Sequence, residues 1–149
     1  MHYASLAVFL LLTAAAAATG SQFMPGEWYA GLAKPAWTPP GWLFAPVWSA
    51  LYVMIAIAGW LAWQRGGLGK PVVLWAAQLV LNAAWTWIMF ERHEIGLALV
   101  DIVALWITIL AFIAVTWRIS RPAALLFGPY LLWVSYASAL NAAIWQLNP

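Results

Sequence analysis

Cysteine is absent from this 149-residue chain, and charged residues make up only 7% of it. Without cysteine there is no disulfide framework, no thiolate chemistry and no Cys-rich metal site. Only two histidines occur, His2 and His93, both at expected segment ends, which argues against a metal centre built by the protein. Soluble domains carry roughly 25% charged residues, so the scarcity of charge excludes that class.

The motifs of conventional catalysis are also missing. No nucleophile with a base, no paired carboxylates and no phosphate-binding glycine loop can be found. Hydrolytic and phosphoryl-transfer chemistry are therefore not expected. The net charge of +2 arises from residues that fall almost entirely between apolar runs, as expected when charges are excluded from hydrocarbon. It gives no indication of nucleic-acid binding.

Apolar residues are abundant: 66% of the chain is hydrophobic and the mean hydropathy is +0.88. A helix needs about 20 residues to cross a hydrocarbon core of roughly 30 Å. Five runs approach or exceed that length, at about 3–19, 43–63, 71–90, 95–117 and 122–147. The sequence predicts an all-α integral membrane protein with one five-helix domain over 1–149. Short connections make the last four helices antiparallel, and the loop at 20–42 is the only long one.

The first apolar run has a second interpretation. Its apolar core followed by small residues is also typical of a cleaved signal peptide, but no Lys or Arg precedes it, as a signal would require. If the run is retained as a helix, the alanines from Ala14 to Ala18 allow a neighbouring helix to approach closely.

Basic residues predict the orientation of the bundle. Cytoplasmic loops carry an excess of Lys and Arg. The side of the N-terminus has four of them and the other side two, namely Arg65, Lys70, Arg118 and Arg121 against Lys34 and Arg92. We therefore expect a cytoplasmic N-terminus, with the long loop and the C-terminus on the opposite side of the membrane.

The long loop and the start of the second run are unusually aromatic. The segment 28–52 contains four prolines and the rings of Trp28, Tyr29, Trp37, Trp42, Trp48 and Tyr52. Exposing a large apolar side chain to water forfeits roughly 1.5–3 kcal/mol. We therefore expect an ordered lid that packs against the membrane bundle.

Polar residues recur at regular spacing inside two of the runs, and a pair of aromatic rings does so in a third. In the third run the spacing is four, at Gln78, Asn82 and Thr86. In the fifth it is three, at Ser135, Ser138 and Asn141, and in the second the rings of Trp48 and Tyr52 are spaced by four. One interpretation is that they tie helices together, because interhelical hydrogen bonds contribute about 0.6 kcal/mol on average. The other is that the faces converge on a cavity with aromatic walls, which favours a flat apolar ligand.

Several residues have competing structural and functional interpretations. Asp101 is the only acid inside a run. One interpretation is that it is hydrated near the membrane interface or caps a helix; the other is that it contacts a ligand. Lys34 either pairs with Glu27 at the surface or meets a ligand carboxylate. Interfacial belts explain the tryptophans near run ends but not Trp28, Trp37, Trp48 and Trp133; the belt tryptophans are Trp42, Trp60, Trp63, Trp87 and Trp117.

A set of rare residues extends over nearly the whole chain. It comprises Trp28, Tyr29, Leu32, Lys34, Pro35, Trp37, Thr38, Pro39, Pro40, Phe44, Trp48, Leu51, Tyr52, Gln78, Leu79, Leu81, Asn82, Trp85, Asp101, Pro129, Tyr130, Leu131, Trp133, Ala137, Leu140 and Asn141. With this set the chain resembles bacterial members of the tryptophan-rich sensory protein/translocator protein family, also called peripheral-type benzodiazepine receptors.

The resemblance implies a five-helix bundle, often a homodimer, in a bacterial cell membrane. It also implies a pocket that binds tetrapyrroles such as protoporphyrin IX and haem, and isoquinoline carboxamide or benzodiazepine ligands, with no cofactor required. The ligand-binding residues carried over by motif position are Trp28, Tyr29, Pro39, Trp48, Tyr52, Gln78, Asn82, Trp85, Trp133, Ala137 and Ser138.

The resemblance leaves three functions open: a sensor that regulates porphyrin levels, a light-dependent porphyrin-degrading activity that uses Trp48 and Trp133, or a transporter of porphyrin or sterol. One departure weakens the case for sterol. The cholesterol-recognition pattern of mitochondrial members needs a basic residue near the C-terminus, and no Lys or Arg follows Arg121.

Overall fold

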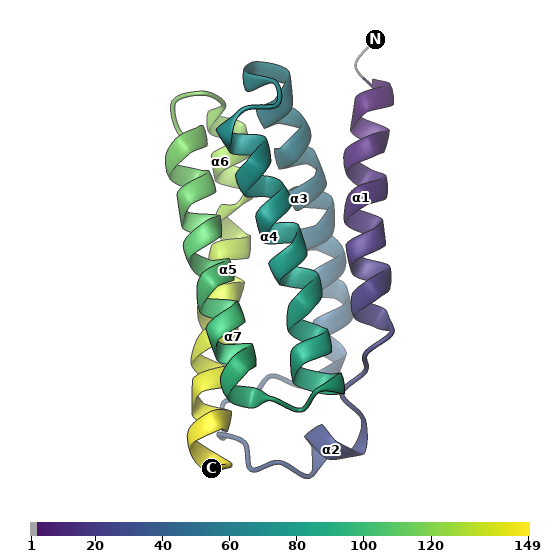
Figure 1. Ribbon diagram of the computed structural model, residues 1–149, viewed down its shortest axis with the longest axis vertical. Helices are drawn as coiled ribbons and strands as arrows, with labels where there is room; N and C mark the ends of the chain where they lie inside the picture. The colour runs from purple at the N-terminus through teal and green to yellow at the C-terminus, as the bar shows by residue number, and fades with distance from the viewer. Residues whose placement is uncertain (1–2) are drawn as a thin grey trace.

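The computed structural model describes residues 3–149, which form helices and loops without any strand in that range. The helices are α1 (Tyr3–Ser21), α2 (Gly26–Ala30), α3 (Phe44–Gly66), α4 (Lys70–Thr86), α5 (Ile95–Thr116), α6 (Arg121–Leu126) and α7 (Gly128–Leu147), with a 3-10 turn η1 (Gly41–Leu43) and a π-turn η2 (Trp87–Glu91). Within 3–149, five helical segments are long and apolar enough to cross a membrane. The predicted fold class, a multi-pass membrane bundle, is confirmed (Figure 1).

The fifth span differs from the single helix expected over 122–147, because it is divided at Phe127 into α6 and α7. Pro129 has no N–H to donate, and a proline ring clashes with the carbonyl four residues earlier. The junction is stabilised by burial of Phe127, whose ring lies 4.1 Å from that of Phe112 and 5.3 Å from that of Tyr130.

Helix α1 packs onto α3 and α4. Its Phe9 meets the indole of Trp75 edge-on at 4.9 Å, and Thr13 and Ala16 are buried beside it. Of the alanine run, only Ala16 is fully buried. Trp75 lies so close to α3 that a Cβ on Gly59 would stand 2.5 Å from its Nε1. This close approach places a bulky indole in the core between three helices.

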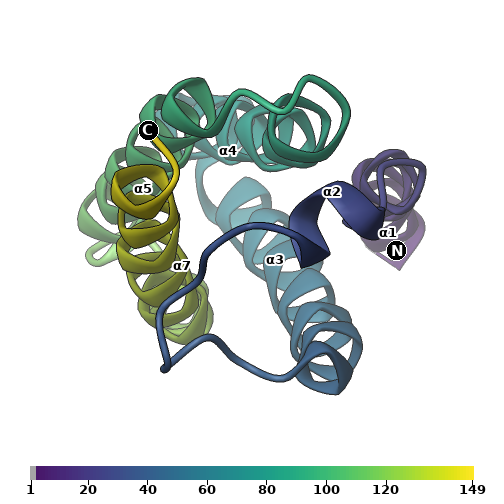
Figure 2. The same ribbon diagram turned by 90° about the horizontal axis from the view of Figure 1, so that it is seen from below.

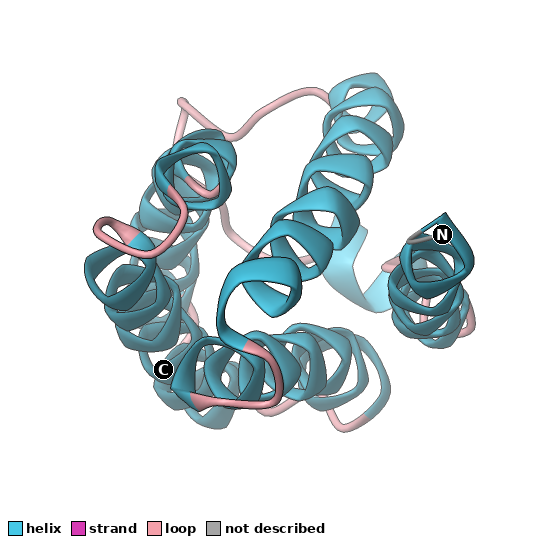
Figure 3. Ribbon diagram, turned by 90° about the horizontal axis from the view of Figure 1, so that it is seen from above, coloured by secondary structure: helices cyan, strands magenta, loops and turns pink. Residues whose placement is uncertain are grey.

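The helix α3 and the fifth span form a V. Toward the N-terminal end of the molecule α3 packs closely on α6, but farther down it barely contacts α7. The loop that carries α2 runs across the lower end of the bundle and bridges the space between α3 and α7 (Figures 1 and 2). Figure 3 shows the same bundle from the end with the N-terminus.

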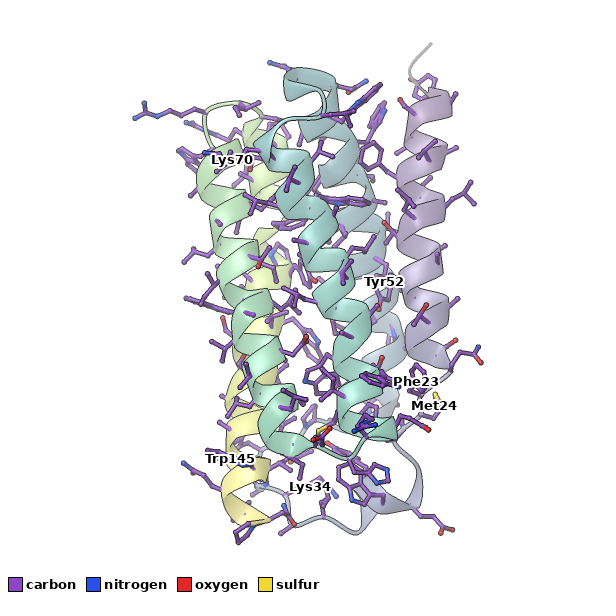
Figure 4. The ribbon with its side chains drawn as sticks, viewed as in Figure 1. Phe23, Met24, Lys34, Tyr52, Lys70 and Trp145 are labelled. Carbon is purple, nitrogen blue, oxygen red and sulfur yellow. The ribbon has the colours of Figure 1, made fainter. Side chains whose placement is uncertain are left out.

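Apart from Asp101 in α5, the charged residues lie at the two ends of the bundle. Lys70 stands at the end that carries the N-terminus and Lys34 at the end that carries the lid, with Tyr52 between them (Figure 4). The turn after η2 lies at the lid end and holds Arg92 and Glu94 in an exposed ion pair at 3.4 Å. In the same turn His93 adopts a φ of +56°, a left-handed conformation that few non-glycine residues accept.

Candidate functional site

A chain of hydrogen bonds crosses the interior between α3, α4 and α7. The Tyr52 hydroxyl donates to Oδ1 of Asn82 at 3.3 Å, and Nδ2 of Asn82 donates to the Tyr130 oxygen at 2.7 Å. The Tyr130 hydroxyl donates to Oε1 of Gln78 at 2.8 Å, and Nε2 of Gln78 donates to the Trp75 carbonyl at 2.8 Å. Tyr130 and Gln78 are 0% exposed. A satisfied buried network of this kind fixes the positions of the helices that contribute to it.

Aromatic rings cover the Tyr52 end of this chain. The Trp48 indole lies 5.4 Å from the Tyr52 ring and stands edge-on to Tyr130 at 6.4 Å and to Trp133 at 6.5 Å. Phe44 meets Trp133 edge-on at 5.9 Å. These are the separations and tilts that aromatic pairs prefer. The half-buried indoles of Trp48 and Trp133 therefore form a wall from two helices that otherwise barely touch.

A second cluster lies nearer the lid. Nε1 of Trp85 donates to Oδ1 of Asn141 at 3.0 Å, and Nδ2 of Asn141 donates to the Ile95 carbonyl at 3.1 Å. Phe90 meets Trp85 edge-on at 5.4 Å and the lid residue Tyr29 at 5.6 Å. The bundle and the lid are thus joined through consecutive aromatic contacts.

The first part of the lid is held by stacking and by a lysine. The Trp28 indole stacks on the His93 imidazole, with centroids 4.1 Å apart and planes 8° apart. Nζ of Lys34 donates to the carbonyls of Tyr29, Ala30 and Leu32, and lies 4.8 Å from the centre of the Tyr29 ring. Lys34 therefore caps the end of α2 and does not form the pair with Glu27 that was one of its two interpretations. Contact with a ligand carboxylate, the other interpretation, stays a prediction. Burial raises the pKa of Tyr29, and the nearby Tyr136 raises it further.

The second part of the lid is attached to α7 and the residues after it. Asn148 exchanges two hydrogen bonds with the backbone of Ala33, at 3.0 Å and 2.8 Å. The Tyr136 hydroxyl donates to the carbonyl of Trp37, and the two rings lie 5.7 Å apart. The lid is thus closed over the bundle by contacts on both of its sides.

The predicted ligand-binding residues fall into three groups. Around the interior hydrogen-bond chain the structure brings together Trp48, Tyr52, Gln78, Asn82 and Trp133, with Ala137 packed against the same cluster. The lid residues Trp28 and Tyr29 and the α4 residue Trp85 pack against the second cluster, where the lid meets the bundle. Pro39 is half-buried in the lid, and Ser138 donates to the Val134 carbonyl of its own helix.

The polar face expected on the fifth span does not form as one surface. Ser135 is exposed and accepts a hydrogen bond from Trp106 at 2.7 Å, whereas Asn141 is buried against α4 and α5. A spacing of three residues turns the position on a helix back by roughly 60° at each step. Both Ser135 and Asn141 therefore reach α5, but only Asn141 also reaches α4. On α4, Thr86 donates to its own helix at Ala83 and takes no part in the chain.

Asp101 is the outstanding electrostatic feature of the bundle. It is 9% exposed, and its Oδ2 is buried without a hydrogen-bond partner among residues 3–149. Hydration or helix-capping near the interface and contact with a ligand both stay predictions for this side chain. In the same range no group of three or more His, Asp or Glu side chains is placed to hold a metal ion, and His2 lies outside the described residues.

Sequence reasoning missed three residues that organise the site. Tyr130 belongs to the recognised residue set but was not predicted to line the pocket; its spacing of three from Trp133 and the need of a buried phenol for a partner were available signals. His93 and Asn148 lie outside the apolar runs, where no periodicity points to the lid.

Known proteins match this chain over nearly its whole length. The sequence model of the TspO/MBR family matches residues 5–146. The tryptophan-rich protein TspO of Chlorobaculum tepidum is 45% identical over 97% of this chain and 96% of its own length. The tryptophan-rich sensory protein of Cereibacter sphaeroides is 34% identical, covering 99% and 94%, and the translocator protein of Ovis aries is 40% identical, covering 94% and 88%.

Proposed function

Because this chain belongs to the TspO/MBR family, we propose that it is a membrane receptor that binds a flat tetrapyrrole and regulates porphyrin levels. The ligand, protoporphyrin IX or haem, lies among the aromatic rings between α3 and α7 and beneath the lid. Isoquinoline carboxamide and benzodiazepine-type ligands compete for the same rings.

The observation that carries this proposal is the wall of Trp48 and Trp133 beside the hydrogen-bond chain. Two indoles at 6.5 Å from different helices offer apolar faces and edges to a planar ring system. The Tyr52 end of the chain adds a polar group at the same place. Small-molecule sites combine mostly apolar walls with a few polar groups that orient the ligand.

The lid supplies a means of signalling. Its attachments to His93, Tyr136 and Asn148 couple the loop to the turn after η2 and to the end of α7. A ligand that prefers one lid position shifts the population of lid conformations toward it. Occupancy is thereby converted into a change at the surface that carries the C-terminus, where a partner can read it.

A titration with protoporphyrin IX tests the proposed site. We expect saturable changes in porphyrin absorbance and in tryptophan emission for the protein in lipid nanodiscs, with competition by haem. Trp48→Phe combined with Trp133→Phe weakens binding, whereas Trp42→Phe leaves it unchanged, because Trp42 is 75% exposed in the loop. Equal affinity in all three proteins would refute the assigned site, and porphyrin uptake without saturation would refute the receptor.

The paired indoles also support a second candidate, the light-dependent degradation of bound porphyrin. Indole is the readily oxidised side chain in this wall, and Trp48 and Trp133 stand together in it. Illumination of the complex in the presence of oxygen should then yield a distinct tetrapyrrole product. If the Trp48→Phe, Trp133→Phe protein bleaches porphyrin at the same rate, the degradation function is refuted and only the receptor function remains.

We also propose a cytoplasmic N-terminus. Four of the six basic residues lie in or beside the two short connections at the N-terminal end, and the other two, Lys34 and Arg92, lie at the lid end. This asymmetry has the sign of the positive-inside rule. Labelling of single cysteines introduced at Gly67 and Gly41 from outside intact cells tests it, with only the second expected to react.

A further inference from the structure

A groove of about 440 Å³ runs between α3 and α7 on the outside of the bundle. Its walls are two matched stripes, each with the spacing i, i+3, i+4, i+7 that marks one face of a helix: Val47, Ala50, Leu51 and Met54 from α3, and Pro129, Leu132, Trp133 and Tyr136 from α7. Facing stripes of this kind normally interdigitate. In this bundle the two stripes stand apart, because α3 packs closely on α6 but makes few contacts with α7.

The groove opens toward the hydrocarbon of the bilayer. Both walls belong to membrane-spanning segments, Gly41–Gly66 and Arg121–Leu147. Leu132 at its rim is 74% exposed, and Ala50 on the opposite wall is exposed as well. The one hydroxyl in the lining, on Tyr136, is engaged by the Trp37 carbonyl. The groove therefore offers an apolar surface to apolar molecules dissolved in the membrane.

At its bottom the groove is lined by Leu51 and Trp133, and Trp133 also belongs to the aromatic wall of Trp48 and Trp133. Leu51 is 4% exposed and belongs to the main core, and Trp133 meets Trp48 edge-on at 6.5 Å. Trp48 in turn meets the fully buried Tyr130. Trp133 therefore separates the groove from the rings that stand beside the hydrogen-bond chain, and its side chain must move before a molecule can pass between them.

The water-facing side offers no such path. To admit a ligand there, the lid must lose the Asn148 contacts with Ala33, the Tyr136 contact with Trp37 and the stack of Trp28 on His93. Of the residues that line the groove, Tyr136 is hydrogen-bonded to the lid, and the contacts of Asn148 with Ala33 and of Trp28 with His93 lie outside the groove. A flat apolar molecule also concentrates in the bilayer rather than in water.

We propose that the α3–α7 groove is a lateral passage through which a flat, largely apolar ligand moves from the bilayer to the rings of Trp48 and Trp133. The passage rests on the proposed receptor function. Trp133 is its inner gate, and the lid closes the aqueous end of the site without serving as the route.

Reversible obstruction of the groove tests this passage. The chain contains no cysteine, so Ala50→Cys can be modified selectively with a benzyl methanethiosulfonate and restored with dithiothreitol. The probe is protoporphyrin IX, delivered from vesicles to the protein in lipid nanodiscs. A passage affects arrival and departure alike, so we expect both rate constants to fall by about tenfold or more, equivalent to a barrier higher by about 1.4 kcal/mol. The dissociation constant is unchanged, and reduction restores both rates in the same sample.

Two further variants serve as a control and as a change of opposite sign. Val80→Cys carries the same modification on the lipid-facing side of α4, where Val80 is 68% exposed, and leaves both rates unchanged. Leu132→Ala widens the rim of the groove and raises both rates. Its effect does not depend on accommodating an added group.

The outcomes separate the passage from the function on which it rests. Unchanged rates after modification of Ala50→Cys, or faster association in Asn148→Ala, would overturn the passage in a protein that still binds. A dissociation constant that rises while departure becomes faster would make the groove a binding site instead of a passage. Absence of saturable binding by the unmodified protein would overturn the receptor and the passage together.

Discussion

Asn148 holds both backbone polar groups of Ala33, although 115 positions separate the two residues. The Ala33 N–H donates to Oδ1 of Asn148 at 3.0 Å, and Nδ2 of Asn148 donates to the Ala33 carbonyl at 2.8 Å. A side-chain amide thereby pairs with a peptide group as a neighbouring strand would. The same Nδ2 lies 2.8 Å from the Ile144 carbonyl, which anchors it to the end of α7.

Asn148→Ala should loosen the lid without unfolding the bundle. Each lost hydrogen bond is worth about 0.5–1.5 kcal/mol, and both act on the loop and not on the core. We expect faster amide hydrogen exchange at 30–40 and an unchanged melting temperature of the bundle. Gln146→Ala is the matched control, because Gln146 is exposed at the end of α7, two residues before Asn148. Unchanged exchange in the lid would show that the Asn148 pair does not hold it.

Tyr130→Phe should destabilise the bundle by about 1–3 kcal/mol. The ring remains, but Nδ2 of Asn82 and Oε1 of Gln78 lose their partner in the interior, and an unsatisfied buried group costs about that amount. Unfolding in mixed micelles measures the change. Tyr3→Phe removes a hydroxyl from a residue that is 67% exposed and should leave stability unchanged. Equal stability of the two variants would refute the stabilising role assigned to the interior hydrogen-bond chain.

Gly59→Ala should destabilise the bundle through overpacking. The new Cβ would stand 2.5 Å from Nε1 of Trp75, and that indole is held by a hydrogen bond to the Ile55 carbonyl at 2.8 Å. Overpacking of a core costs about 1–3 kcal/mol, measured as a lower melting temperature. Gly128→Ala, with no neighbour within 4 Å of the added atom, is the control. A stable Gly59→Ala protein would mean that α3 and α4 can separate at this point.

Asp101→Leu should stabilise the ligand-free protein. The variant removes a buried oxygen that lacks a partner among the described residues, and an apolar replacement avoids the cost of burying it, about 1–3 kcal/mol. The melting temperature in nanodiscs checks this. A marked loss of stability would indicate that a lipid headgroup or bound water satisfies the carboxyl group in the membrane.

The architecture was predictable because its signals are local. Apolar runs of sufficient length, separated by charged turns, predicted the five helices, and the spacing of Gln78 and Asn82 placed both on one face, as the structure has them. The division at Phe127 was not predicted, although Pro129 indicates a disturbance. Its position depends on how Phe127 packs against Phe112, which is a tertiary contact.

The lid was predictable in composition but not in its attachments. The aromatic residues of the loop required a packing surface, yet nothing in the local sequence pairs Trp28 with His93 or Ala33 with Asn148. Such contacts depend on where the helix ends meet in space. For the same reason the sequence allowed Lys34 either a pair with Glu27 or a ligand carboxylate, whereas the turn of the chain places its ammonium group near three carbonyls.

The interior hydrogen-bond chain has a direction. It ends on the Trp75 carbonyl, which can only accept, so Gln78 must turn its NH₂ toward that carbonyl and its oxygen toward Tyr130. The orientation of every group back to Tyr52 then follows, and the Tyr52 proton is committed to Asn82. What Tyr52 still offers to a neighbouring molecule is an oxygen lone pair. Tyr52 can therefore accept a hydrogen bond from a bound molecule but has no proton left to donate to it.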